Sequence, residues 1–117
     1  MHNTGKGRFG EAVAVRFLKK RGYSILNKNY RCRFGEMDII AREGATLCFI
    51  EVKFRYDTRY GLPEESITPK KIFRLYKIAD YYLSYNGLAD ISCRFDVVSI
   101  MKNEKGLLDI KVIKEAF

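Results

Sequence analysis

The sequence predicts an α/β fold in which two helices pack against a mixed β-sheet. Residues 5–21 and 68–86 carry apolar side chains at the spacing of an amphipathic helix. Five other segments are short, rich in β-branched and aromatic residues, and bounded by turn-forming residues, as strands are. The expected order is therefore α-β-β-β-α-β-β. A chain of 117 residues is long enough to bury a core, and we expect one domain spanning 1–117.

The first helix is expected over residues 5–21. Phe9, Val13 and Phe17 recur every four residues and predict the stripe that faces the sheet, which Ala12, Ala14 and Leu18 widen. Gly22 follows the last turn, at a position where glycine commonly ends a helix. A strand with one polar face is expected next, over residues 23–32.

The segment from Gly35 to Phe54 predicts two strands joined by a turn around Gly44. It is apolar except for three ionisable residues: Asp38 on the first strand, and Glu51 and Lys53 on the second. Charged groups are seldom placed where a sheet becomes buried unless something compensates them. These three residues are therefore candidates for a functional site.

The register of this hairpin decides whether Asp38 shares a face with Glu51. Glu51 and Lys53 are two residues apart, so they point to the same face of a strand. A two-residue turn at Glu43-Gly44 would place Asp38 diagonal to Glu51, and a four-residue turn would place it directly opposite. A three-residue turn would send Asp38 to the other face. Two of the three registers thus bring the carboxylates together.

Two carboxylates held so close together in a partly buried site need a shared proton or a cation. Mg²⁺ takes one or two carboxylates and leaves its other positions to water and phosphate oxygens. One interpretation is therefore a Mg²⁺ or Mn²⁺ site with Asp38 and Glu51 as ligands, at which water attacks a phosphodiester. Lys53 would orient that water or neutralise the phosphate. The other interpretation is a cross-strand charged network without chemistry, in which Lys53 pairs with Glu51 or Glu36.

Residues 55–67 contain glycine, proline and mixed charges without periodicity, so we expect a loop there. The second helix is expected to begin at Pro69, with Thr68 as its N-cap, and to end at Asn86.

Two further strands are expected over residues 91–101 and 107–113. Asp96 lies within the apolar sequence of the first of them. We expect it to pair with Arg94 or to cap a buried network.

The net charge of +8 lies in the first third of the chain. Residues 1–33 hold nine Lys and Arg against a single acid, Glu11, whereas residues 34–117 are neutral overall. A concentrated positive field suits a polyanion such as nucleic acid, or an anionic membrane surface. An ordinary basic surface is the alternative.

Three cysteines, Cys32, Cys48 and Cys93, are far apart and form no Cys-x-x-Cys motif. We expect reduced thiols in a cytoplasmic protein, rather than disulfides or a zinc site. No run approaches the roughly 18 apolar residues of a membrane helix. No membrane segment and no secretory signal are therefore expected.

Five motifs together resemble the YraN family of uncharacterised bacterial proteins. They are Gly7-Arg-Phe-Gly-Glu11, Gly35-Glu-Met-Asp38-Ile-Ile, Phe49-Ile-Glu51-Val-Lys53, Pro63-Glu-Glu-Ser-Ile-Thr-Pro-Lys-Lys71 and Arg94-Phe-Asp96-Val-Val. That family is more distantly similar to archaeal Holliday junction resolvases and to the PD-(D/E)XK nuclease superfamily. The resemblance implies a restriction-endonuclease-like αβββαβ core, here with an extra C-terminal strand.

The resemblance also implies roles for individual residues. It implies that Asp38 and Glu51 are metal ligands, that Lys53 is a catalytic lysine, and that Val52 offers its backbone carbonyl to the metal. Glu11 becomes a candidate third acid, although its spacing alone suggests a surface partner for an arginine of the same helix. The superfamily's proline before the aspartate is absent, because Met37 stands there.

The expected function is a metal-dependent endonuclease that hydrolyses DNA phosphodiesters, with branched or structured DNA among its substrates. One alternative is a nucleic-acid-binding protein that keeps the fold without cleaving, and another is a protein-interaction module. A homodimer is plausible by analogy with the resolvases. The residues expected to hold nucleic acid are Lys6, Arg8, Arg31, Arg33, Arg55, Lys70, Lys71 and Arg74.

Overall fold

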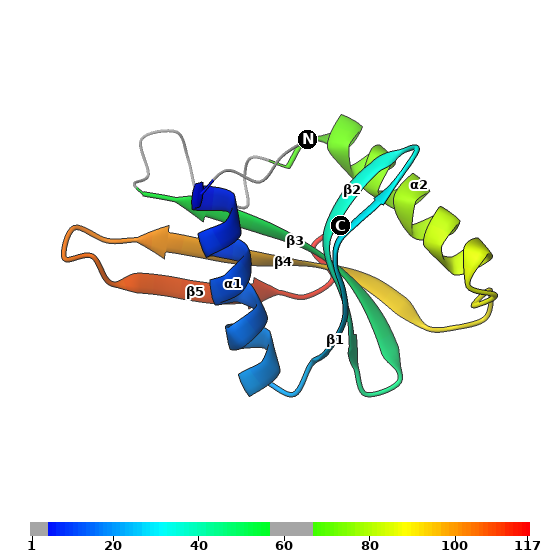
Figure 1. Ribbon diagram of the computed structural model, residues 1–117, viewed down its shortest axis with the longest axis horizontal. Coiled ribbons are helices and arrows are strands. Elements are labelled where there is room, and N and C mark those ends of the chain that lie inside the picture. Colours follow the sequence, from blue (N-terminus) through cyan, green and yellow to red (C-terminus); the bar gives the residue numbers. More distant parts are fainter. Residues whose placement is uncertain (1–4, 57–66) are drawn as a thin grey trace.

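The computed structural model describes residues 5–56 and 67–117, and it confirms the predicted order of helices and strands (Figure 1). The elements are α1 (Gly5–Lys20), β1 (Ser24–Cys32), β2 (Gly35–Glu43), β3 (Thr46–Arg55), α2 (Pro69–Tyr85), β4 (Cys93–Lys102) and β5 (Leu108–Ile113). The loop expected over residues 55–67 lies mostly outside the described residues.

The five strands form one mixed sheet in which their spatial order is the same as their order in the sequence. β1 and β2, β2 and β3, and β4 and β5 pair antiparallel, whereas β3 and β4 pair parallel. A parallel pair needs a crossover connection, and the chain between β3 and β4 contains α2. The fold is therefore the αβββαβ arrangement that the resemblance implies, with β5 added at one edge.

The two helices cover opposite faces of the sheet, and each closes a separate apolar core (Figure 1). On one face, Ala14 and Leu18 of α1 pack against side chains that include Ile39 and Ile50. On the other face, α2 packs against side chains that include Ile40 and Phe49. Since consecutive residues of β2 and β3 point to opposite faces, these central strands contribute to both cores.

The buried stripe of α1 agrees with the prediction at Ala14 and Leu18 and differs from it at Phe9. Gly10, Ala14 and Leu18 are buried, whereas the Phe9 side chain is 50% exposed and packs edge-on against the Phe54 ring. A Cβ atom on Gly10 would lie 3.5 Å from the Phe54 ring, which shows how closely the helix approaches the sheet. The helix buries its smaller residues because they allow that approach.

The start of α2 confirms the predicted cap. The Thr68 hydroxyl oxygen accepts a hydrogen bond from the Lys71 backbone N–H at 3.2 Å, and Pro69 begins the helix. Within the described part of the chain, no helix is long and apolar enough to cross a membrane.

Asp96 is fully buried and forms the centre of a polar network, as predicted. Its two carboxylate oxygens accept hydrogen bonds from Arg94 Nε at 2.9 and 3.0 Å. Tyr23 Oη donates to the same carboxylate at 3.3 Å, and the Glu115 backbone N–H donates at 3.1 Å. Arg94 also pairs with Glu43, at the end of β2. Asp96 is therefore a structural acid that joins β4 to the neighbouring parts of the chain.

Candidate active site

The β2–β3 turn places Asp38 directly opposite Glu51. Glu43 pairs with Thr46, so the turn has two residues, Gly44 and Ala45, one position later than predicted. Gly44 has a φ of 60°, a left-handed conformation that glycine adopts without strain. The same register pairs Ile39 with Ile50 and brings Asp38 level with Glu51. Of the registers considered, direct opposition was expected of a four-residue turn, and the structure reaches it with a two-residue turn one position later than Glu43-Gly44.

Where the backbone hydrogen bonds between β2 and β3 end, the Asp38 side chain provides the next hydrogen bond between the two strands. The paired residues end at Ile39 and Ile50. Beyond this last pair, Asp38 Oδ2, one residue before Ile39, accepts a hydrogen bond at 2.8 Å from the backbone N–H of Val52, two residues after Ile50. The carboxylate is thus held between the two strands and beside Glu51. Val52 enters the site through its N–H, and a role for its carbonyl as a metal ligand stays a prediction.

Glu51 is buried, with only 4% of its surface exposed, and it lies against two ammonium groups. Lys71 Nζ of α2 is 2.7 Å from Glu51 Oε2, and Lys53 Nζ is 3.7 Å from the same oxygen. The sequence predicted Lys71 as a nucleic-acid contact and did not reveal its ion pair with Glu51. The pairing of Lys53 with Glu51 is the one expected of a charged network.

The pKa values of Lys53 and Lys71 are shifted in opposite directions. Burial, followed by the hydrogen bond with Lys71, lowers the pKa of Lys53 to about 8. Burial alone would also lower the pKa of Lys71, but the attraction of Glu51 outweighs it and the pKa of Lys71 is raised. Lys53 is therefore the group of the pair that can lose a proton near neutral pH, while Lys71 stays charged.

Asp38 holds its proton unusually tightly. Burial, and then the negative charge of Glu51, raise the pKa of Asp38 to about 8, although the hydrogen bond from Val52 works in the opposite direction. Asp38 is therefore mostly protonated near pH 7, and its ionisation would place a second negative charge beside Glu51. An additional cation would relieve this repulsion.

A pocket of about 290 Å³ opens beside the two carboxylates, between the sheet and the start of α2. Asp38 and Glu51 line it together with Arg31, Lys71 and Arg74. Three of the residues predicted to hold nucleic acid thus stand around the carboxylate pair. A phosphate entering this pocket would meet cations beside the two acids.

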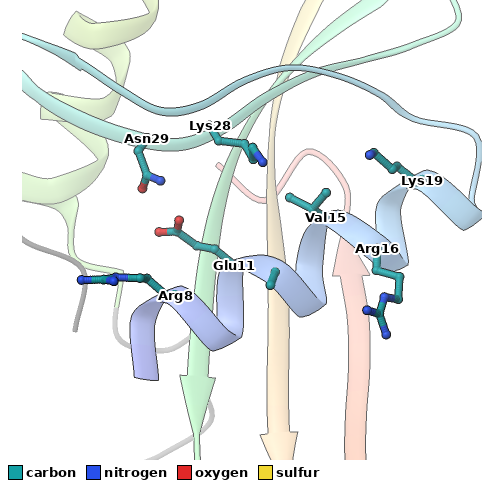
Figure 2. A pocket seen from close by; sticks show the side chains of 8 residues that line it. Arg8, Glu11, Val15, Arg16, Lys19, Lys28 and Asn29 are labelled. Atoms are coloured by element: carbon teal, nitrogen blue, oxygen red, sulfur yellow. The ribbon is translucent and has the colours of Figure 1, made fainter. Parts of the chain in front are cut away.

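Glu11 approaches the site from α1. It lines a second pocket, of about 440 Å³, together with Arg8, Lys28 and Asn29. Figure 2 shows its carboxylate pointing from α1 toward Asn29, a residue of β1 with a left-handed φ of 54°. The charge of Glu11 also contributes to the raised pKa of Asp38, so the two acids are close enough to interact.

Direct ligation by all three acids is not seen in the described residues. Among residues 5–56 and 67–117, no three His, Cys, Asp or Glu side chains converge closely enough to hold one ion. Glu11 as a third ligand therefore stays a prediction. Asp38 and Glu51 fit a divalent cation, because they are hard oxygen donors that line one pocket.

The remaining predicted nucleic-acid residues do not gather at the pocket. The Arg33 guanidinium lies over the Phe34 ring at 4.9 Å, and Lys70 is exposed at the start of α2. Arg55 is partly buried at the end of β3, and Arg8 lies on α1 in the second pocket. The Lys6 side chain belongs to the part that the structure leaves undescribed.

Sequence reasoning named Glu36 only as a possible partner of Lys53, whereas the structure pairs Glu36 with Arg31 and places it in this pocket. Glu36 and Asp38 are two apart on β2, so the alternation of a strand could have placed both on one face. The contact between Lys71 and Glu51 had no such signal, because it joins two elements that are separated by a long connection.

These features define an α/β protein with an αβββαβ core and an opposed pair of carboxylates, flanked by lysines, on its central strands. The chain belongs to the family described as "Uncharacterised protein family UPF0102", whose model matches residues 10–100. This is the YraN family that the sequence motifs resemble.

Several relatives carry the name "UPF0102 protein" and match the chain over nearly its whole length. The protein from Caldicellulosiruptor bescii is 49% identical over 113 residues, which cover 95% of each chain. The protein from Syntrophus aciditrophicus is 46% identical over 115 residues, covering 98% of this chain and 90% of the relative. A protein from Caldicellulosiruptor saccharolyticus is 46% identical and is matched in full.

Proposed function

We propose that this protein is a metal-dependent endonuclease that hydrolyses DNA phosphodiesters. The observation that carries the proposal is the direct opposition of Asp38 and Glu51 in a pocket that is also lined by Arg31, Lys71 and Arg74. Carboxylates provide a cation site, and the surrounding cations suit the phosphates of a nucleic acid. The concentration of positive charge in residues 1–33 supports the same class of partner.

Different residues of the pocket would bind the cation, transfer the proton and hold the DNA backbone. A divalent cation, when bound, would be held by Asp38 and Glu51 and would activate a water molecule and neutralise charge on the phosphate. Lys53, with its pKa of about 8, can accept a proton from the attacking water or donate a hydrogen bond to the phosphate. Arg31 and Arg74, at the rim of the same pocket, would hold the DNA backbone.

Lys71 would change partners when substrate binds. Its ammonium group now compensates Glu51 at 2.7 Å. A cation on Glu51 would compensate that carboxylate instead, and Lys71 would then be available to a phosphate oxygen. The pocket can in this way exchange one positive charge for another without leaving Glu51 unpaired.

Cleavage is the direct test of the proposal. We expect cleavage of at least one DNA form among duplex, nicked, flapped, single-stranded and four-way substrates, dependent on Mg²⁺ or Mn²⁺. Lys53→Ala should lower the rate by about 100-fold, because it removes a proton-transfer or charge-stabilising group. Lys105→Ala, which removes an exposed lysine of the β4–β5 turn, should leave the rate unchanged. Cleavage that survives Lys53→Ala would come from a contaminating nuclease and would contradict the proposal.

The second candidate function is DNA binding without cleavage. The ion pair between Lys71 and Glu51 favours it, because Lys71 already supplies the cation that the acidic pair needs. A protein that binds DNA but shows neither Mn²⁺-dependent cleavage nor Mn²⁺ binding would be this second candidate.

Both candidates predict that Arg31 and Arg74 contact the DNA backbone. The double variant Arg31→Ala/Arg74→Ala should weaken DNA binding at least about 10-fold at 0.1 M salt. It should also reduce the slope of log K against log salt by roughly 2, since two phosphate contacts are lost. Fluorescence anisotropy with a labelled duplex at several salt concentrations measures both effects. An unchanged slope would mean that these arginines do not contact phosphates, and Arg42→Ala/Lys105→Ala provides a control with the same loss of charge.

A further inference from the structure

One carboxylate oxygen in the pocket has no hydrogen-bond partner among the residues that the structure describes. Glu36 Oε1 is buried and accepts no hydrogen bond from the described residues. The Glu36 side chain is only 8% exposed, and its other oxygen accepts a hydrogen bond from Arg31 Nε at 3.2 Å. A buried carboxylate oxygen without a donor is costly, which indicates a donor that the described residues do not supply.

The place of this oxygen indicates what kind of donor is missing. Glu36 lines the same pocket as Asp38 and Glu51, and it precedes Asp38 by two residues on β2. Lys71, the nearest ammonium group to the acidic pair, is already engaged with Glu51. A third carboxylate beside two opposed carboxylates adds to the attraction of a cation to the acidic side of the pocket.

The ligand does not contact all three acids directly. Within the described residues, no three acidic, His or Cys side chains come close enough to ligate a single ion. Mg²⁺ and Mn²⁺ sites often retain several water molecules, whose protons point away from the ion. Such a water can donate a hydrogen bond to a carboxylate that is too distant to bind the metal itself.

We propose that Glu36 is a third carboxylate of the divalent-cation site, which accepts a hydrogen bond at Oε1 from a water molecule on the ion. This inference rests on the proposed function, since it assigns a further residue to the same site. It explains why a glutamate is kept nearly buried with one oxygen unsatisfied. Glu36 then acts by positioning the hydrated ion between Asp38 and Glu51.

The test measures binding of Mn²⁺ alone, by calorimetry and by the electron paramagnetic resonance signal of the free ion, without DNA. We expect Glu36→Gln to weaken Mn²⁺ binding by about 10- to 100-fold, as loss of a hydrogen-bonding partner of a metal site commonly does. Asp38→Asn should abolish binding. Glu104→Gln, which removes an exposed acid from the β4–β5 turn, should leave it unchanged.

A variant of Arg31, the partner of Glu36, distinguishes a purely structural role of Glu36 from a role in cation binding. If Glu36 served only to hold Arg31, then Arg31→Ala would weaken Mn²⁺ binding as much as Glu36→Gln. We expect instead that Arg31→Ala leaves binding unchanged or tightens it, because a positive charge leaves the pocket. Thermal unfolding in EDTA verifies that each variant is folded.

The outcomes distinguish this inference from the proposed function. Wild-type affinity in Glu36→Gln, together with loss of binding in Asp38→Asn, would overturn the role of Glu36 and leave the cation site in place. Absence of Mn²⁺ binding by the wild-type protein would overturn both.

Discussion

Replacing Asp38 with asparagine is expected to stabilise the metal-free protein at alkaline pH, by about 3 kcal/mol at pH 9. The pKa of Asp38 rises from 3.8 to about 8 in the folded protein, because of burial and then the charge of Glu51. One pKa unit corresponds to about 1.4 kcal/mol. We expect roughly half of the full shift to appear, since Lys53 and Lys71 can move toward the charged acid. Asparagine keeps an oxygen that can accept the hydrogen bond from Val52.

The direction of this effect follows from the raised pKa. Below the unfolded-state value of 3.8, Asp38 is protonated in both states and costs nothing. Between 3.8 and about 8 the unfolded chain releases the proton while the folded protein retains it, so the stability of the wild type falls as the pH rises. The difference between the variant and the wild type should therefore be near zero at pH 3 and largest above pH 8.

Urea denaturation in EDTA at several pH values measures this difference. Asp80→Asn, on the exposed side of α2, changes the net charge equally and should show no such pH dependence. Added Mn²⁺ should stabilise the wild type and not Asp38→Asn, because only the wild type binds the ion. A variant less stable than the wild type at pH 9 would show that the charge of Asp38 is compensated by the chain itself.

Asp96→Asn should have the opposite effect and destabilise the protein by about 3–5 kcal/mol. Asp96 is as deeply buried as any residue of the chain, but its charge is paired with Arg94 through hydrogen bonds to both of its oxygens. The amide would leave the Arg94 charge, whose side chain is only 15% exposed, without its main buried partner. It would also replace one of the two acceptor oxygens with an NH2 group, so either Tyr23 Oη, which donates to Oδ2, or the Glu115 N–H, which donates to Oδ1, would lose its acceptor.

The same denaturation experiment at pH 7 measures the loss. Asp109→Asn, an exposed position on the neighbouring strand β5, should change the stability by less than about 0.5 kcal/mol. A loss of less than about 1 kcal/mol in Asp96→Asn would mean that Arg94 finds sufficient compensation in Glu43. Opposite signs for Asp38→Asn and Asp96→Asn would identify Asp38 as the acid that awaits an external cation.

The candidate site was predictable as far as it depends on single strands. Asp38, Glu51 and Lys53 were recognisable because charged residues stood out within apolar strands. Whether they share a face depends on the number of residues in the turn, and which residues face each other depends on its position, which the structure gives as Gly44 and Ala45. A shift of one residue there changes every cross-strand neighbour.

The sequence by itself determined the order of the elements, the cap of α2 at Thr68, and the pairing of Asp96 with Arg94. Each of these depends on residues close together in the chain, where periodicity and local hydrogen bonding decide the outcome. The tertiary structure alone decided that α1 buries Gly10 rather than Phe9, and that Lys71 compensates Glu51. Those contacts join separate elements, so they depend on how closely each helix approaches the sheet, which no local pattern specifies.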